Sequence, residues 1–174
     1  MATLRKGKCY RHMTRPYTRR SKVKAKAYIK TVPPSKVVRY DMGDPKKNYN
    51  YELVLVSREV GQIRHNAIES ARQVVNRKLQ EGLGQKAYCL KLLLYPHHIL
   101  RENKMLSGAH ADRLQTGMAH SFGRTVGLAV RAKKGKALFS VKVLTNGVEQ
   151  ARKALKLATP RLPGTYSIQV KKLN

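Results

Sequence analysis

The sequence predicts an α+β fold, an α/β sandwich in which two helices cover one face of a mostly antiparallel sheet. Two observations favour it. Strand-like apolar segments recur between residues 49 and 173, and two of the segments between them carry apolar residues at helical spacing. A third observation adds an extended basic arm: residues 1–40 hold thirteen Lys or Arg and no acid. We therefore expect an arm over 1–40 and one domain over 41–174.

The first half of that domain predicts a strand, a helix and two more strands. Residues 49–57 are rich in Val, Leu and Tyr, as strands are. From Gly61 onward, apolar residues recur at three- and four-residue steps, which indicates an amphipathic helix that a pair of glycines ends. Residues 87–95 predict a strand that a proline stops, and residues 97–102 predict a short strand after it.

The second half begins with two strand-like segments, residues 125–132 and 137–145. They are close in sequence and Gly135 suits a tight turn between them, so we expect a β-hairpin. A closing strand over 165–173 shows clean alternation of apolar and polar residues.

A second helix is expected between the hairpin and the closing strand. Its apolar residues, from Val148 to Ala158, follow helical spacing. Asn146, with Glu149 three residues later, resembles a capping box at the start of this helix. The Thr159-Pro160 pair should end it, because the residue before a proline disfavours helical backbone.

The charge of the chain indicates a polyanionic partner. Its 174 residues include 37 Lys and Arg against 9 Asp and Glu, a net charge of +28, and like charges repel in a compact fold. Nucleic acid is the first candidate and an anionic membrane the second. No basic segment forms the amphipathic helix that a membrane surface needs, no apolar run approaches the roughly 20 residues of a spanning helix, and no secretory signal is present. We therefore expect no membrane and no small-molecule substrate.

The arm is the expected main contact with nucleic acid. Its cations would neutralise phosphates, while its tyrosines would stack on unpaired bases or pack on ribose. Its apolar runs are too short to build a core, so we expect it to be largely extended and to order on its partner. The expected RNA-binding residues are Arg5, Lys6, Lys8, Tyr10, Arg11, Arg15, Tyr17, Arg19, Arg20, Lys22, Lys24 and Lys26.

The stretch from Met105 to Gly123 combines Ser, His and Asp, the residue types of a hydrolase. It lacks the G-x-S-x-G spacing of a nucleophile elbow, and the few acids of the chain form no D-x-D or E-x-x-E cluster. The two cysteines, Cys9 and Cys89, make no paired Cys motif. Cys9 and His12 form a C-x-x-H pair, half of a metal site at best, and the other histidines have no acid or thiol at a matching spacing. We therefore expect no enzyme, no metal site and no cofactor, and a reducing compartment.

The same stretch suits a slender loop that approaches another molecule closely. Gly108, Gly117 and Gly123 permit unusual backbone angles and close approach, and small alanines keep the profile slim. Arg113 and Arg124 could bind phosphate. We expect a functional loop over residues 103–118, with a mobile spacer as the weaker alternative.

Three segments together resemble a known family. They read KMLSGAHADRLQTGMAHSFG (104–123), LYPHHILRENKML (94–106) and KCYRHMTRPYTR (8–19). All three are similar to the universal large-subunit ribosomal protein family called L ten-e in archaea and eukaryotes and L sixteen in bacteria. Eukaryotic members have a longer C-terminal extension than this chain, so we expect an archaeal member.

The resemblance implies a fold with a hammerhead-type β motif and a cytoplasmic, ribosome-bound protein. It implies binding to large-subunit rRNA near the base of the central protuberance and the aminoacyl-tRNA site, beside neighbouring ribosomal proteins, and no catalysis. It also implies that the loop faces tRNA and the peptidyl-transferase centre. The loop residues expected there are Lys104, Met105, Leu106, Ser107, Gly108, Ala109, His110, Ala111, Asp112, Arg113, Gln115 and Arg124.

Two rival functions remain open from the residues alone. An architectural nucleic-acid-binding protein outside the ribosome would share the charge, although no basic recognition helix or zinc module supports it. A hydrolase that acts on RNA would need turnover that depends on Ser107, His110 and Asp112, and we expect no such turnover.

Overall fold

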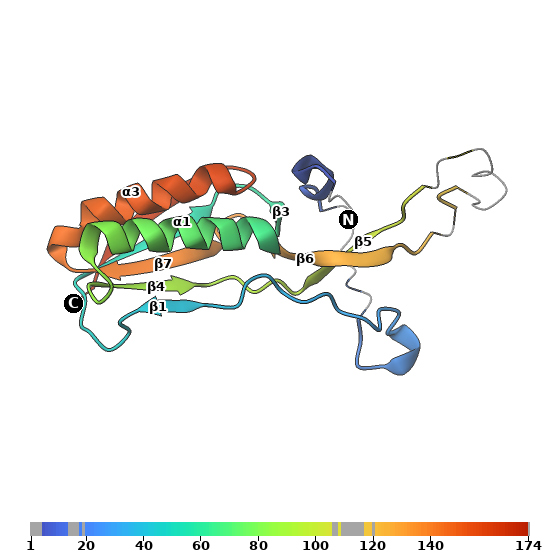
Figure 1. The fold of residues 1–174 in the computed structure, drawn as a ribbon, viewed down its shortest axis with the longest axis horizontal. Coiled ribbons are helices and arrows are strands. Elements are labelled where there is room, and N and C mark those ends of the chain that lie inside the picture. Colours follow the sequence, from blue (N-terminus) through green and yellow to red (C-terminus); the bar gives the residue numbers. More distant parts are fainter. Residues whose placement is uncertain are drawn as a thin grey trace.

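The computed structural model describes residues 5–13, 18, 20–105, 108, 117–119 and 121–173. The molecule is elongated, with the helices at one end and two long strands that project from the other (Figure 1). In chain order the described elements are β1 (Asp41–Gly43), β2 (Tyr51–Ser57), β3 (Gly61–Arg64), α1 (His65–Leu83), β4 (Tyr88–Leu92), β5 (His98–Glu102), β6 (Arg124–Ala132), β7 (Ala137–Val143), α3 (Val148–Ala158) and β8 (Tyr166–Lys172).

The strands form two sheets, and every strand pair in both is antiparallel. The larger sheet has the order β1-β4-β7-β2-β8, and the smaller sheet has the order β3-β6-β5. Helices α1 and α3 lie side by side over one face of the larger sheet (Figure 1). These features confirm the α+β class. None of the described helices is long and apolar enough to cross a membrane.

The main core lies between the helices and the larger sheet. Ile68, Val75 and Leu155 on the helices are completely buried, as are Leu53 and Phe139 on the sheet. Side chains three or four residues apart share one face of a helix, and alternate residues share one face of a strand, so each element brings a continuous apolar surface to this core. The spacing of apolar residues in the sequence therefore predicted the buried faces of these elements correctly.

Helix α1 begins later than the sequence predicts. Residues Gly61–Arg64 form strand β3, which pairs with β6 through Ile63 and Val130, and the helix starts at His65. Ile63 is 1% exposed and contributes to the main core from the strand. Its burial explains why it fits the apolar stripe, although its backbone is extended.

The predicted hairpin of residues 125–132 and 137–145 is wrong. The tight turn is present: Gly135 has φ 80°, and the Lys136 N–H donates to the Lys133 carbonyl at 3.1 Å. The two strands nevertheless part after the turn, because β6 lies between β3 and β5 while β7 lies between β4 and β2. Each strand is central in its own sheet, so neither has a free edge for the other.

The capping box at Asn146 is also wrong. Residues Thr145–Gly147 form a 3-10 turn, so that Gly147 precedes α3 and no side chain caps it. Glu149 still lies in the first turn of the helix, where a negative charge is favourable. The helix ends at Ala158, and a 3-10 turn follows from Thr159, close to the predicted end.

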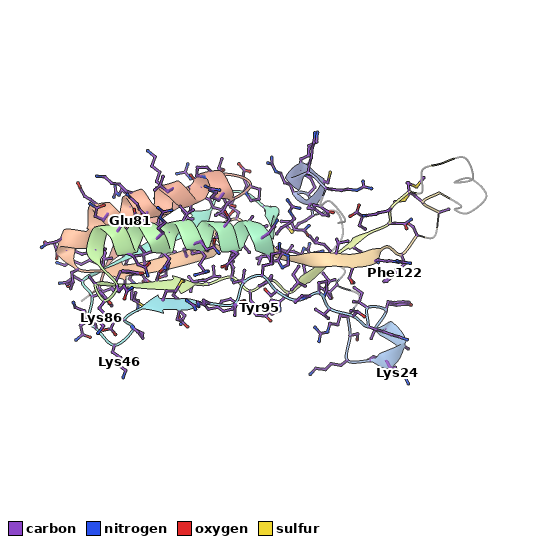
Figure 2. The ribbon with its side chains drawn as sticks, viewed as in Figure 1. Lys24, Lys46, Glu81, Lys86, Tyr95 and Phe122 are labelled. Carbon is purple, nitrogen blue, oxygen red and sulfur yellow. The ribbon has the colours of Figure 1, made fainter. Side chains whose placement is uncertain are left out.

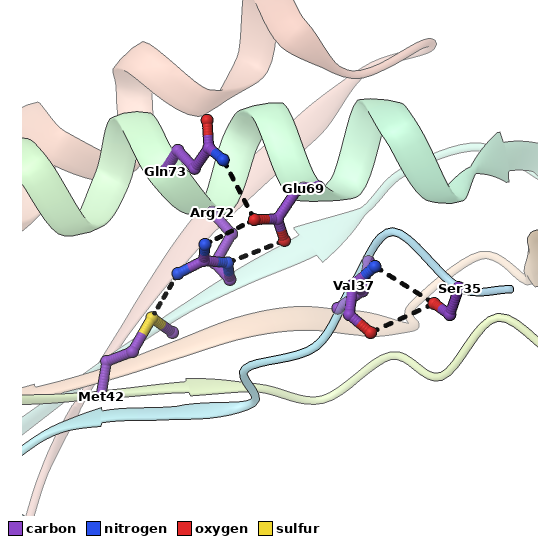
Figure 3. A network of polar contacts seen from close by, with 6 residues as sticks. All are labelled: Ser35, Val37, Met42, Glu69, Arg72 and Gln73. Atoms are coloured by element: carbon purple, nitrogen blue, oxygen red, sulfur yellow. Dashed lines mark hydrogen bonds and ion pairs between the residues drawn. The ribbon is translucent and has the colours of Figure 1, made fainter.

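Strand β1 is an edge strand that the sequence analysis did not predict. Gly43 has φ 86° and lies so close to β4 that a Cβ atom there would come within 2.1 Å of the Tyr88 carbonyl oxygen. Met42 on the same strand contacts Arg72 of helix α1, whose guanidinium binds Glu69 through two nitrogens (Figure 3). This network ties the edge of the sheet to the helix above it.

Candidate RNA interface

The carboxylates of the chain are largely used within the fold. The described residues form five ion pairs, which join Arg5 to Glu102, Arg72 to Glu69, Arg77 and Lys78 to Glu81, and Lys91 to Asp41. The nine acids could offset at most nine of the 37 cations. The surplus of 28 positive charges therefore needs an anionic partner outside the chain.

Residues 5–13 are docked on the smaller sheet (Figure 1). The buried side chain of Gln62 on β3 donates to the Tyr10 carbonyl at 2.9 Å, and the Gln62 N–H donates to the Arg11 carbonyl at 3.0 Å. Arg64 donates to the Arg5 carbonyl at 3.3 Å. A short 3-10 turn, Gly7–Tyr10, lies between these contacts. The backbone of this segment is therefore held by hydrogen bonds to the domain.

Two of the expected RNA-binding residues bind Glu102, at the end of β5, where residues 5–13 contact the smaller sheet. The Arg5 Nε donates to the Glu102 carboxylate at 2.5 Å, and the Tyr10 hydroxyl donates to the other oxygen at 3.3 Å. The Arg64 guanidinium lies over the Tyr10 ring at 5.1 Å. Burial, followed by the charge of Glu102, raises the pKa of the Tyr10 hydroxyl, so it stays protonated as a donor. Arg5 and Tyr10 thus serve as anchors within the fold.

The other expected cations of the described arm are on the surface. Lys6, Lys8 and Arg11 flank the anchors and are exposed. Further along, a second 3-10 turn, Lys24–Lys26, continues the basic surface (Figure 2). The exposed cations of this second part are Arg20, Lys22, Lys24 and Lys26.

Two apolar residues anchor the rest of the arm. Ile29 is buried against Ile99 of β5 and Leu128 of β6, which together form a small second core. Val37 is buried in the main core. The arm, whose apolar runs are too short to build a core of their own, thus contributes single side chains to cores that other elements form.

The base of the 103–118 loop is built around Phe122. Its ring lies 4.1 Å from the Arg101 guanidinium and 5.8 Å from the ring of Tyr28 in the arm. At Gly123 a Cβ atom would fall 2.5 Å from the Glu102 carbonyl carbon. The backbone before β6 therefore passes so close to the end of β5 that only glycine fits at this position. Gly117 has φ 63°, the left-handed conformation that favours glycine. The sequence indicated these glycine roles, but it gave no signal for Phe122.

Several expected site residues lie outside the described residues, so their placement stays a prediction. Lys104, Met105 and Gly108 are described and exposed, as is Arg124 at the start of β6. The expected residues outside the described part are Arg15, Tyr17, Arg19, Leu106, Ser107, Ala109, His110, Ala111, Asp112, Arg113 and Gln115.

The titratable groups of the described part are not arranged for catalysis. Burial raises the pKa of the Cys89 thiol, which favours the unreactive neutral form. Burial, reinforced by neighbouring cations, lowers the pKa values of His65 and His98. Within the described ranges, no three His, Cys, Asp or Glu side chains come together as a metal site would require. The surface is therefore suited to binding a polyanion through charge and packing.

The fold and its exposed cations define a basic α+β protein that binds a polyanion. The family described as Ribosomal protein L16p/L10e matches residues 13–169 of this chain. The chain belongs to this ribosomal protein family. Membership makes it a structural constituent of the large ribosomal subunit, cytoplasmic and ribosome-bound, and not an enzyme.

Individual relatives agree with this assignment over nearly the full chain. The "Large ribosomal subunit protein uL16" of Staphylothermus marinus is 45% identical over 161 residues, which cover 92% of this chain and 89% of the relative. The protein of that name from Thermofilum pendens is 46% identical and covers 92% of each chain. The one from Saccharolobus solfataricus is 43% identical over 170 residues, 96% of this chain and 92% of the relative. The similarity is to archaeal members, as the sequence predicts.

Proposed function

We propose that the chain binds large-subunit rRNA chiefly through residues 1–40, while residues 41–174 form the folded domain that presents them. The carrying observation is that Arg5 and Tyr10 are held by Glu102, whereas Lys6, Lys8 and Arg11 beside them are exposed. A segment with a fixed backbone and free cations loses little conformational entropy when it binds phosphates. The name of the relatives, a large ribosomal subunit protein, supports rRNA as the polyanion.

The finer part of the proposal concerns position in the subunit. The resemblance of residues 94–123 to the family supports binding near the central protuberance and the aminoacyl-tRNA site, with loop 103–118 toward tRNA and the peptidyl-transferase centre. Strands β5 and β6 project away from the helix-covered end (Figure 1), a shape that suits a loop extended toward a distant target. Neighbouring ribosomal proteins are the further partners.

The arm is tested by deleting residues 2–30 and measuring co-sedimentation with large subunits through a salt wash. We expect incorporation to be lost while circular dichroism still reports a folded domain, because Val37 keeps its place in the main core. RNA affinity should also become less dependent on salt, by a slope of about 0.7 to 0.9 for each phosphate contact removed. Normal incorporation of the truncated chain would contradict the proposal.

The loop is tested separately by deleting residues 105–111. We expect folding and rRNA binding to be retained, since the deletion keeps Arg101, Phe122 and the anchors of the arm. Translation or subunit maturation should be impaired instead. If cells with this deletion grow and translate like wild type, the loop is only a spacer.

The architectural alternative is tested by comparing duplex DNA with structured large-subunit rRNA at matched salt. We expect tighter binding to the rRNA. A preference for duplex DNA would favour the alternative.

A further inference from the structure

Tyr95 lies outside both cores and has no evident structural task. Its side chain is 55% exposed, between the helix-covered end and the projecting strands (Figure 2). It borders a cavity of about 390 Å³ that Leu93, His98, Arg131 and Lys136 also line. A large exposed aromatic beside an open cavity is typical of a binding surface.

Neighbouring rings hold Tyr95 in one orientation. The Tyr40 ring stacks on it at 5.8 Å between centroids with 20° between the planes, and the His97 ring lies at 4.5 Å and 49°. Tyr40 is itself packed against the main core. The ring of Tyr95 is therefore preorganised, so a flat partner could stack on it with little loss of side-chain entropy.

Two buried polar atoms beside Tyr95 have no hydrogen-bond partner within the described part of the chain. They are the Tyr40 hydroxyl and the His98 Nδ1. Burial, with Arg131 and Arg101 nearby, lowers the pKa of His98, so its ring is neutral at physiological pH and carries one donor and one acceptor. Both atoms are buried, so the proposed contact with RNA rests on the exposed ring of Tyr95 and not on them.

The charges around the cavity favour RNA over a protein segment. Arg131 and Lys136 line it, and no carboxylate does so among the described residues. An adjoining groove of about 790 Å³ shares Leu93 and adds lysines, including Lys91 and Lys142. The groove also holds Asp41, paired with Lys91 at 3.8 Å, and Glu52, which accepts a hydrogen bond from Ser140, so its positive charge is partly offset.

We propose that Tyr95 is a stacking platform for an unpaired nucleotide of the bound RNA, with Arg131 and Lys136 contacting the flanking phosphates. This inference rests on the proposed rRNA-binding function and deepens it by naming the form of RNA that one surface recognises. Double-stranded RNA keeps its bases stacked inside the helix, so it could not use the exposed ring. A single strand, a bulge or a loop could.

The test compares a single-stranded RNA oligomer with a blunt duplex of the same sequence, both bound to the full chain at one salt concentration. Tyr95→Ala should weaken single-strand binding by about five- to a hundredfold, the usual effect of losing one stacked base. Duplex binding should be unchanged, and Tyr95→Phe should bind like wild type because stacking needs only the ring. Leu157→Ala on the outer face of α3, a side chain 46% exposed, is the matched control and should change neither affinity.

A second measurement identifies the contact directly. Single-stranded RNA that carries 4-thiouridine should crosslink to the peptide containing Tyr95, and Tyr95→Ala should remove that crosslink. If wild type binds RNA and Tyr95→Ala binds each of the two RNAs as tightly as wild type does, the platform is wrong and the proposed function stands. If wild type binds neither RNA, the proposed function itself fails. A crosslink from Tyr95 to a neighbouring protein in assembled subunits, with none to RNA, would also overturn the platform.

Discussion

Glu102 binds Arg5 and Tyr10 within the fold, while the neighbouring cations of the N-terminal segment stay exposed. Its carboxylate is nearly buried, with 9% of the side chain exposed, and it holds both Arg5 and Tyr10. The hydrogen bond and the charge of Glu102 raise the pKa of the Arg5 guanidinium. One acid in a very basic chain thus helps to hold residues 5–13 in place on the domain.

We predict that Glu102→Gln loosens residues 5–13 without unfolding the domain. The substitution keeps the volume of the side chain but replaces a charge-assisted hydrogen bond by a weaker neutral one. Amide hydrogen exchange at Cys9 and Arg11 should become severalfold faster, while exchange in α1 stays unchanged. Glu81→Gln, which breaks an exposed pair on α1, is the control and should leave residues 5–13 as they are. Unchanged exchange in Glu102→Gln would show that the hydrogen bonds of Gln62 and Arg64 hold the segment without this charge.

Gly123 carries a second residue-scale prediction. A Cβ atom at this position would lie 2.5 Å from the Glu102 carbonyl carbon and 2.7 Å from the Asn103 nitrogen, both of which are backbone atoms. Since backbone cannot move aside cheaply, Gly123→Ala should lower the free energy of unfolding by about 1–3 kcal/mol. Denaturant unfolding measures this. Gly7→Ala, whose nearest neighbour is the flexible end of Arg64 at 3.5 Å, should cost much less, and equal losses would contradict the steric explanation.

At the scale of elements, the network of Arg72 joins helix α1 to strand β1 (Figure 3). The guanidinium spans from Glu69 on α1 to Met42 on β1, and Gln73 adds a bond to the same carboxylate at 3.1 Å. Strand β1 has only three residues and pairs with β4 alone. Arg72 therefore adds a polar contact between this short strand and the helix, beside the packing of Met42 against the main core.

We predict that Arg72→Met destabilises the protein by about 1–3 kcal/mol at neutral pH, because Glu69 loses its partner in a largely buried position. The hydrogen bond from Arg72 lowers the pKa of Glu69 below its ordinary value of 4.5. A depressed carboxyl pKa stabilises the fold above the unfolded pKa, and that stability is lost as the pH falls through the folded value. The difference between wild type and variant, from denaturant unfolding, should therefore shrink below pH 4.5. A constant difference down to acid pH would mean that the loss comes from packing. Arg77→Met, at an exposed pair, is the control.

The elements also show what a sequence can and cannot predict. The stripe from Ile68 to Leu79 and the alternation in β8 are local patterns, and both elements were predicted. Strand pairing is not local: β6 and β7 follow a good turn, yet each finds its partners elsewhere. The same limit holds for the candidate site. Charge alone predicted a polyanion, but the partners of Glu102 and Phe122 lie 20 to 100 residues away along the chain, where no spacing rule applies.

At the scale of the whole molecule, the two sheets have cores of very different size. The larger sheet and the helices share one extensive core, which also takes in Ile63 and Val130 of the smaller sheet, whereas Ile99 and Leu128 of the smaller sheet pack with Ile29 of the arm in a small second core. A small core supports little stability of its own. The projecting end should therefore open more readily than the helix-covered end.

We predict that Ile29→Ala separates these two regions in hydrogen exchange. Removal of a buried Ile side chain costs about 2–5 kcal/mol, and here the loss falls on the small core, so exchange should rise in β5, β6 and residues 20–30. Exchange in β7 and α3 should stay at the wild-type rate. Leu155→Ala, which removes a completely buried side chain from the main core, should instead raise exchange in all elements together. If Ile29→Ala also accelerates exchange in α3 to the same extent, the protein opens as one cooperative unit, and the arm is as much part of the fold as the helices are.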